Sequence, residues 1–174
     1  VQAAVNVLVW NINLSFGPRC ITLWGAGDFR EFYKMMFLQS KVCFIINAAM
    51  GSLIATFAVP ILKLWLGEIP EYAVTFVQVI FIYANLRSFH DALDLPYKSS
   101  GIIKPFQIII TAFNLLSILL AWILLKAGYS YVSAFWAMII SEFLIVSTAS
   151  ITAKYILKFP LLLKTFLLHD LIYI

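Results

Sequence analysis

A cluster of ionisable side chains stands out in the stretch NLRSFHDALDLPYKSSG of an otherwise apolar chain. Its members are Arg87, His90, Asp91 and Asp94. They occupy positions i, i+3, i+4 and i+7, so a helix would carry all of them on one face. On that face Arg87 can pair with Asp91. His90 can pair with Asp94 in the same way. A shared polar face is typical of a membrane helix that borders a wet cavity, and a guanidinium there can bind a diphosphate through two parallel hydrogen bonds.

The place of this cluster along its helix leaves a second interpretation open. A helix that enters the membrane near Tyr72 has used about 20 residues, enough to cross the hydrocarbon, when it reaches Asp91. The cluster would then lie at the inner headgroup level, where charges cost little. Asp94 could also reach Lys98 there. The cluster is therefore either a phosphate contact or gate at the cytoplasmic mouth, or a solvated helix end.

Glu142 is a single carboxylate near the middle of another long apolar segment. A charged carboxylate at the centre of a membrane helix costs about 2.5–3.5 kcal/mol on insertion scales. Glu142 is therefore expected to face the interior of a helix bundle. There it either binds and releases a proton as part of a coupling mechanism, or makes a hydrogen bond that only stabilises packing.

Further polar groups are spread along the apolar segments. Arg19 follows Pro18 at the end of the first segment, where it either anchors that end at the inner interface or helps to collect a diphosphate. Amide side chains are expected to bond across helices, with some of them lining a cavity; they are Asn11, Asn13, Asn47, Gln78, Asn85, Gln107 and Asn114.

Composition places the chain among membrane proteins. It is 63% hydrophobic and only 11% charged, whereas soluble domains carry about 25% charged residues. Because so few polar groups cannot cover a soluble surface, we expect an all-α, polytopic membrane protein. The net charge of +4 does not indicate nucleic acid, because the basic residues lie in short loops between apolar spans. The chain does not begin with Met and stops inside an apolar stretch, so it is expected to be a fragment of a longer protein.

The sequence contains no recognisable enzyme site. Cys20 and Cys43 lack CxxC spacing and are expected to act as small apolar residues. His90 and His169 are far apart, no nucleophile has a histidine and an acid at hand, and no glycine-rich phosphate loop precedes a helix. We expect neither an enzyme nor a metal site, and no cofactor apart from a coupling ion such as H⁺ or Na⁺.

Charged residues divide the chain into five predicted spans of one membrane domain: 1–17, 42–66, 71–95, 104–126 and 129–153. A separate helix lying along the inner interface is predicted at 28–38, because Asp28 and Glu31 form a capping box. Its apolar face would consist of Phe29, Phe32, Tyr33, Met36 and Phe37. The alternative is that the second span simply begins early.

Basic residues predict the orientation of these spans. The segments after the first, third and fifth spans hold nine Lys and Arg residues, and the two alternate loops hold only Lys63 and Lys126. The side of the membrane that holds these nine basic residues is expected to be cytoplasmic. Aromatic residues flank the two lysine-poor loops, as in a belt at the outer interface; they are Trp65, Tyr72, Trp122, Tyr129, Tyr131 and Trp136.

The order of motifs along the chain resembles one family of membrane proteins. FGPRCITLWGAGDFREFYKMMFLQSKV resembles a loop in which a proline at a helix end is followed by a Gly-Asp pair and a basic residue, here Pro18, Gly27, Asp28 and Lys41. PILKLWLGEIPEYAVTFVQVI resembles the outer loop, with its Leu-Trp-Leu-Gly turn at 64–67, and YKSSGIIKPFQI is similar to the connection before the next helix. The family is the Wzx-like oligosaccharide-lipid flippases, in the superfamily of MATE exporters and MurJ-type flippases. The resemblance spans nearly the whole chain and would place it in the C-terminal half.

The resemblance implies two pseudo-symmetric helix bundles around a central cavity, with this chain forming part of one half. It implies a flippase that moves undecaprenyl-diphosphate-linked oligosaccharide across the bacterial inner membrane by alternating access, for lipopolysaccharide, capsule or exopolysaccharide synthesis. The expected partners are that lipid-linked substrate, membrane lipids and a polysaccharide polymerase. Candidate residues for substrate binding or coupling are Arg87, His90, Asp91, Asp94, Glu142 and Arg19. The alternatives are a cation-coupled MATE-type exporter of small molecules, a membrane glycosyltransferase fragment, and a membrane scaffold without transport activity.

Overall fold

The computed structural model describes residues 2–156 and is helical over nearly all of that range. Its helices are α1 (Gln2–Gly25), α2 (Phe29–Thr56), α3 (Ala58–Leu66), α4 (Ala73–Ser100), α5 (Lys104–Lys126) and α6 (Val132–Ile156). Within the described residues no segment forms a strand. The predicted all-α helix bundle is therefore confirmed.

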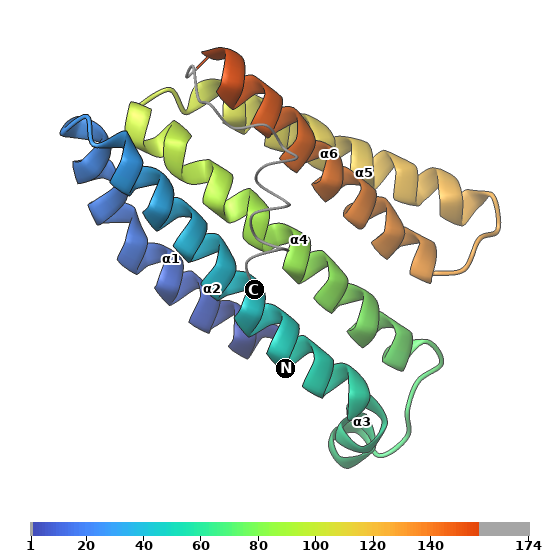
Figure 1. Cartoon of the computed structure of the whole chain (residues 1–174). Helices are drawn as coiled ribbons and strands as arrows, with labels where there is room; N and C mark the ends of the chain where they lie inside the picture. The colour runs from blue at the N-terminus through green and yellow to red at the C-terminus, as the bar shows by residue number, and fades with distance from the viewer. Residues whose placement is uncertain (1, 157–174) are drawn as a thin grey trace.

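The central helix of the bundle is α4. It packs against α1 and α2 and also against α6, while α5 packs mainly against α6. The long helices run back and forth, so the α1–α2 turn, the α4–α5 connection and the last turn of α6 lie at the same end of the bundle (Figure 1). This end carries most of the basic side chains; among them are Arg30, Lys34, Lys98, Lys104 and Lys154. Lys63 and Lys126 lie at the opposite end.

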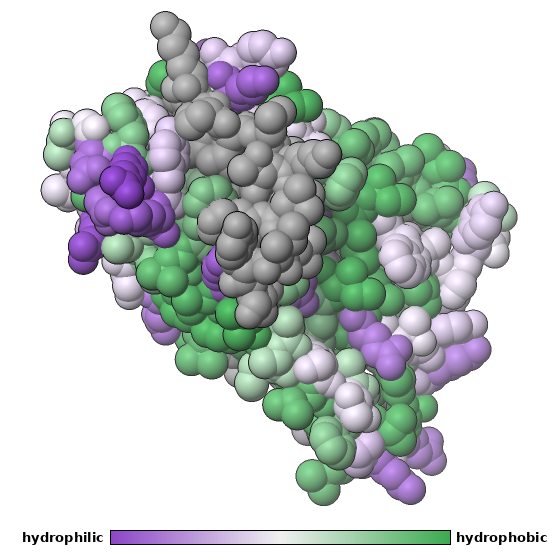
Figure 2. Space-filling model, viewed as in Figure 1, coloured by the Kyte–Doolittle hydropathy of each residue, from purple (hydrophilic) through white to green (hydrophobic). Residues whose placement is uncertain are grey.

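Three of the helices, α2, α5 and α6, are long and apolar enough to cross a membrane. Helices α1 and α4 are also long, at 24 and 28 residues, but neither contains an equally apolar stretch. In α4 the cause is its cluster of ionisable residues. Apolar side chains cover the side of the bundle that α5 and α6 form (Figure 2). The chain is thus a helical membrane protein in which a comparatively polar helix is surrounded by more apolar ones.

The predicted interfacial helix at 28–38 is not a separate element. A single helix, α2, runs from Phe29 to Thr56 without a turn, which is the alternative in which the second span begins early. Asp28 does cap it, accepting a hydrogen bond from the Glu31 N–H at 3.2 Å. Phe32 and Met36, expected to face lipid, are fully buried in the protein. They are covered because α1 extends beyond its predicted end and lies beside the start of α2.

Two helices continue through a proline at which the sequence predicted an end. The predicted span 1–17 stops before Pro18, but α1 continues to Gly25. The predicted span 71–95 stops before Pro96, but α4 continues to Ser100. A proline removes one N–H donor and bends a helix, and contacts with neighbouring helices can hold the remainder in place.

The last turn of α4 shows such a contact. The Tyr97 hydroxyl donates to the Ala149 carbonyl of α6 at 2.7 Å, and the Tyr97 ring stacks on Phe106 with a centroid distance of 4.7 Å. The helix then ends at Gly101, whose φ of 76° is the left-handed conformation that suits glycine.

The predicted span 42–66 is instead divided at Phe57 into α2 and the short helix α3. Pro60 explains the break, because it has no N–H for the Thr56 carbonyl and its ring would collide with that carbonyl in a straight helix. In its actual place Pro60 lies in the first turn of α3, where it is tolerated.

Candidate functional site

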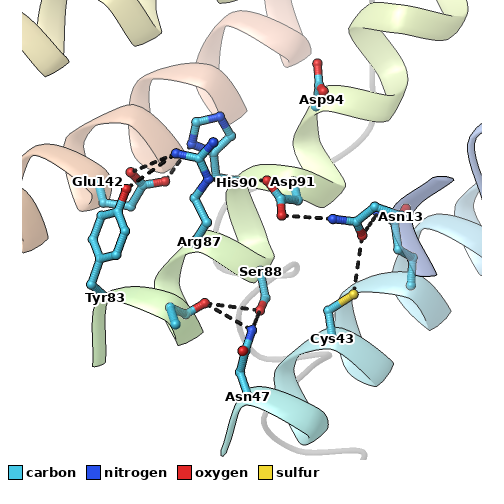
Figure 3. Close-up of polar contacts among 12 residues, drawn as sticks. Asn13, Cys43, Asn47, Tyr83, Arg87, Ser88, His90, Asp91, Asp94 and Glu142 are labelled. Atoms are coloured by element: carbon cyan, nitrogen blue, oxygen red, sulfur yellow. Dashed lines mark hydrogen bonds and ion pairs between the residues drawn. The ribbon is translucent and has the colours of Figure 1, made fainter. Parts of the chain in front are cut away.

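A buried carboxylate and a buried imidazole join α6 to α4 near the middle of both helices. Glu142 and His90 are 1% and 3% exposed, and the Glu142 Oε1 lies 2.5 Å from the His90 Nδ1 (Figure 3). The edge of the His90 ring also contacts Phe106, at a centroid distance of 5.4 Å. The expectation that Glu142 faces the bundle interior is therefore confirmed. The predicted pair of His90 with Asp94 is wrong, because helical spacing along α4 carries no information about a partner on α6.

Arg87 lies between two carboxylates. Its Nε is 3.4 Å from the Asp91 Oδ1, which confirms the predicted pair, and its Nη1 is 3.9 Å from the Glu142 Oε2. The same Nη1 donates to the Tyr83 hydroxyl at 3.4 Å. The guanidinium is half-exposed, whereas Glu142 is almost completely shielded. Both oxygens of Glu142 thus face cationic or hydrogen-bonding groups of α4.

Asp91 extends this network to α1 and α2. Its Oδ2 accepts a hydrogen bond from the Asn13 Nδ2 at 2.9 Å. The Asn13 Oδ1 in turn accepts from the Gln39 Nε2 at 2.6 Å and from the Cys43 Sγ at 3.3 Å. One connected set of polar contacts therefore runs from α6 through α4 to α1 and α2, as Figure 3 shows for the labelled residues.

A second polar contact holds α2 against α4. The Asn47 Nδ2 donates to the Ser88 Oγ at 2.9 Å and to the Ala84 carbonyl at 3.3 Å. One turn further along α2, a Cβ added to Gly51 would lie 2.9 Å from the Phe81 ring. The two helices are therefore as close as a glycine permits at this point.

These contacts border a cavity of about 290 Å³ between α1, α2 and α4. Seven of its ten lining residues have polar side chains, and one aromatic ring of α1 also contributes; the lining residues are Asn6, Val9, Trp10, Asn13, Asn47, Tyr83, Ala84, Arg87, Ser88 and Asp91. Of these, Arg87 carries a positive charge and Asp91 a negative charge. A polar cavity inside a bundle with apolar outer faces can hold water or a hydrogen-bonding ligand.

The remaining predicted residues lie apart from this cavity. Asp94 forms an ion pair with Lys98 one turn further along α4, as the sequence allowed. Arg19 is exposed on α1 and does not line the cavity. The cluster is also not at a helix end, because α4 continues to Ser100 and places Arg87 near its middle. Arg87, His90 and Asp91 therefore do not form the end of the helix, and His90 is buried; the depth of the cluster in the membrane stays a prediction.

Several residues of this site were not singled out from the sequence. Tyr83 precedes the ionisable cluster along the chain. Ser88 lies within the cluster and is buried. Asn13 and Asn47 were among the amides expected to bond across helices, some of them lining a cavity, and both do bond across helices and line the cavity. Ser88 follows Arg87 directly and so points to a different face, which explains why the predicted polar face did not include it.

Among the described residues, no group of three His, Cys, Asp or Glu side chains is placed to hold a metal ion. Comparison of the chain with protein-family profiles, curated proteins and solved structures gave no match.

Proposed function

We propose that this chain forms part of a membrane transporter that moves a lipid-diphosphate-linked oligosaccharide across the bacterial inner membrane. The observation that carries the proposal is a set of ionisable groups at mid-helix, of which His90 and Glu142 are buried and Arg87 and Asp91 line a polar cavity. Ionisable residues inside membrane helices are costly, and they usually mark substrate or ion pathways. The order of motifs that resembles the Wzx-like flippases gives the substrate class.

Coupling is proposed to act through the contact between Glu142 and His90. This contact joins α4, which also packs against α1 and α2, to α6, which also packs against α5. Taking up a further proton would remove the carboxylate charge that faces both His90 and Arg87. Loss of that attraction would allow α6 to move relative to α4, as alternating access requires.

Arg19 is the better candidate for a contact with the diphosphate. It is exposed near the basic end of the bundle, where an anionic headgroup would lie. Arg87, in contrast, already faces Asp91 and Glu142. The cation-coupled exporter would use an unengaged carboxylate to bind a cation, and both oxygens of Glu142 are engaged. The flippase is therefore the function we favour.

The test uses the full-length protein in liposomes that contain a lipid-diphosphate oligosaccharide. Movement of the sugar between leaflets is followed by its accessibility to a membrane-impermeant oxidant, with and without a pH gradient. We expect the gradient to accelerate movement, and Glu142→Gln to abolish that acceleration. Glu31→Gln is the matched control, because Glu31 lies in an exposed pair with Lys34. Absence of any movement above that of protein-free liposomes would contradict the proposed function, and a wild-type response from Glu142→Gln would contradict the coupling.

A further inference from the structure

The cavity between α1, α2 and α4 is poorly suited to an anion. Arg87 is its cationic lining residue, and the guanidinium charge is balanced by Asp91 at 3.4 Å and Glu142 at 3.9 Å. Asp91 also lines the cavity, so a phosphate placed against Arg87 would meet a carboxylate in the same wall. Like charges in a partly buried site repel strongly. A ligand of this cavity should therefore carry no net charge.

A buried amide fixes the α2 side of the cavity. The Asn47 side chain is 3% exposed, and its Nδ2 donates to the Ser88 Oγ and the Ala84 carbonyl. These bonds hold α2 against α4, so the groups that meet a ligand must come from the more exposed side chains of the wall.

Other lining groups offer donors as well as acceptors. The Tyr83 hydroxyl accepts from Arg87 and keeps its own proton to donate. Asn6, on α1, presents an exposed amide with both kinds of group. A hydroxyl is the ligand group that matches such a wall, because it both donates and accepts.

The ring of Trp10 and the size of the cavity narrow the choice further. Trp10 lines the cavity and is 63% exposed, so one face is free to pack against the C–H groups of a ring. The volume of about 290 Å³ lies at the low end of small-molecule pockets. This is room for one ring, and not for a chain of several.

We propose that this cavity binds an uncharged polyhydroxyl ring, a single sugar residue, with its hydroxyls against Tyr83 and Asn6 and a ring face on Trp10. The diphosphate of a lipid-linked substrate would remain outside it. The inference rests on the proposed function for the source of the sugar, and on the cavity alone for its recognition.

The test measures binding of uncharged monosaccharides to the purified full-length protein in lipid nanodiscs by calorimetry. Glucose, galactose and N-acetylglucosamine are the probes, and inorganic diphosphate is the competitor. We expect saturable binding of at least one sugar that an excess of diphosphate leaves unchanged. Trp10→Ala and Asn6→Leu should each weaken it by about tenfold. Trp10 and Asn6 are both exposed, so neither substitution should impair folding.

The matched controls remove side chains of the same kinds at positions outside the cavity. Trp136→Ala removes an exposed ring of α6, and Asn11→Leu removes an exposed amide of α1 outside the cavity. Neither should change the affinity. Displacement of the sugar by diphosphate, absence of binding for all three sugars, or equal losses in the controls would overturn the inference. Transbilayer movement of the lipid-linked substrate without sugar binding would contradict this inference alone, whereas sugar binding without movement would contradict the proposed function alone.

Discussion

Removing Glu142 should destabilise the bundle more than replacing both members of its buried pair. The Glu142 Oε1 lies 2.5 Å from the His90 Nδ1, and the two side chains are 1% and 4% exposed. Glu142→Ala would leave the imidazole without its acceptor and remove the charge that faces Arg87. Breaking a buried pair in this way costs about 3–5 kcal/mol of unfolding free energy.

Two further variants distinguish the loss of a partner from the loss of volume. Glu142→Gln keeps a hydrogen-bonding group at the same place and should cost about 1–2 kcal/mol. The double variant His90→Phe/Glu142→Met replaces the pair by apolar groups of similar size. It should lie within about 1 kcal/mol of the wild type, because burial of the pair carries a large desolvation penalty that the double variant avoids. A phenylalanine ring would keep the edge contact that His90 makes with Phe106, at a centroid distance of 5.4 Å.

The assay is unfolding of the purified full-length protein in mixed micelles by titration with a denaturing detergent, followed by circular dichroism. Glu31→Gln is the control, because its exposed pair with Lys34 should contribute no more than about 1 kcal/mol. These expectations would be wrong if the double variant lost as much unfolding free energy as its two single variants lose together. They would also be wrong if Glu142→Ala were as stable as the Glu31 control.

Three other predictions concern helix packing. Gly51→Val should destabilise the bundle by about 1–3 kcal/mol, since its side chain would collide with the Phe81 ring at 2.9 Å; the same detergent titration measures this, and an unchanged midpoint would contradict it. Tyr97→Phe should cost about 1 kcal/mol through loss of the 2.7 Å hydrogen bond to the Ala149 carbonyl, and a loss near zero would show that the bond is replaceable. Pro60→Ala should allow α2 and α3 to join into one straighter helix, so the distance between spin labels on the two should increase, and an unchanged distance would assign the break to another cause.

Much of the fold could be predicted from the sequence because lipid imposes simple rules. The long apolar segments, the polar loops and the charge asymmetry follow from the cost of exposing polar groups to hydrocarbon. Boundaries were less predictable, since a proline ends a helix only where nothing else supports it. Pro18 and Pro96 lie inside helices, whereas Pro60 separates two. Contacts from other helices decide between these outcomes, and sequence spacing does not contain them.

The candidate site, too, could be predicted from the sequence only in part. The pair of Arg87 with Asp91 follows from helical spacing along α4 and was predicted. The partner of His90 lies 52 residues away on α6, where spacing within one helix cannot identify it. The expectation that Glu142 faces inward came from its cost in lipid. Its actual partner could have been inferred only by matching one buried carboxylate with one buried imidazole at similar depth.

The polar cavity should be wet, whereas equally exposed side chains elsewhere should face lipid. Trp10 and Ile118 test it directly, because their exposed fractions are nearly equal at 63% and 65%, and only Trp10 lines the cavity. Each is replaced by Cys in the full-length protein in membranes, and the rate of reaction with a charged, water-soluble thiol reagent is measured. The native Cys20 and Cys43 are both buried and should give a low background. We predict that Trp10→Cys reacts at least about tenfold faster than Ile118→Cys, because a thiol in hydrocarbon neither ionises nor meets the reagent. Equal rates at the two positions would contradict this prediction.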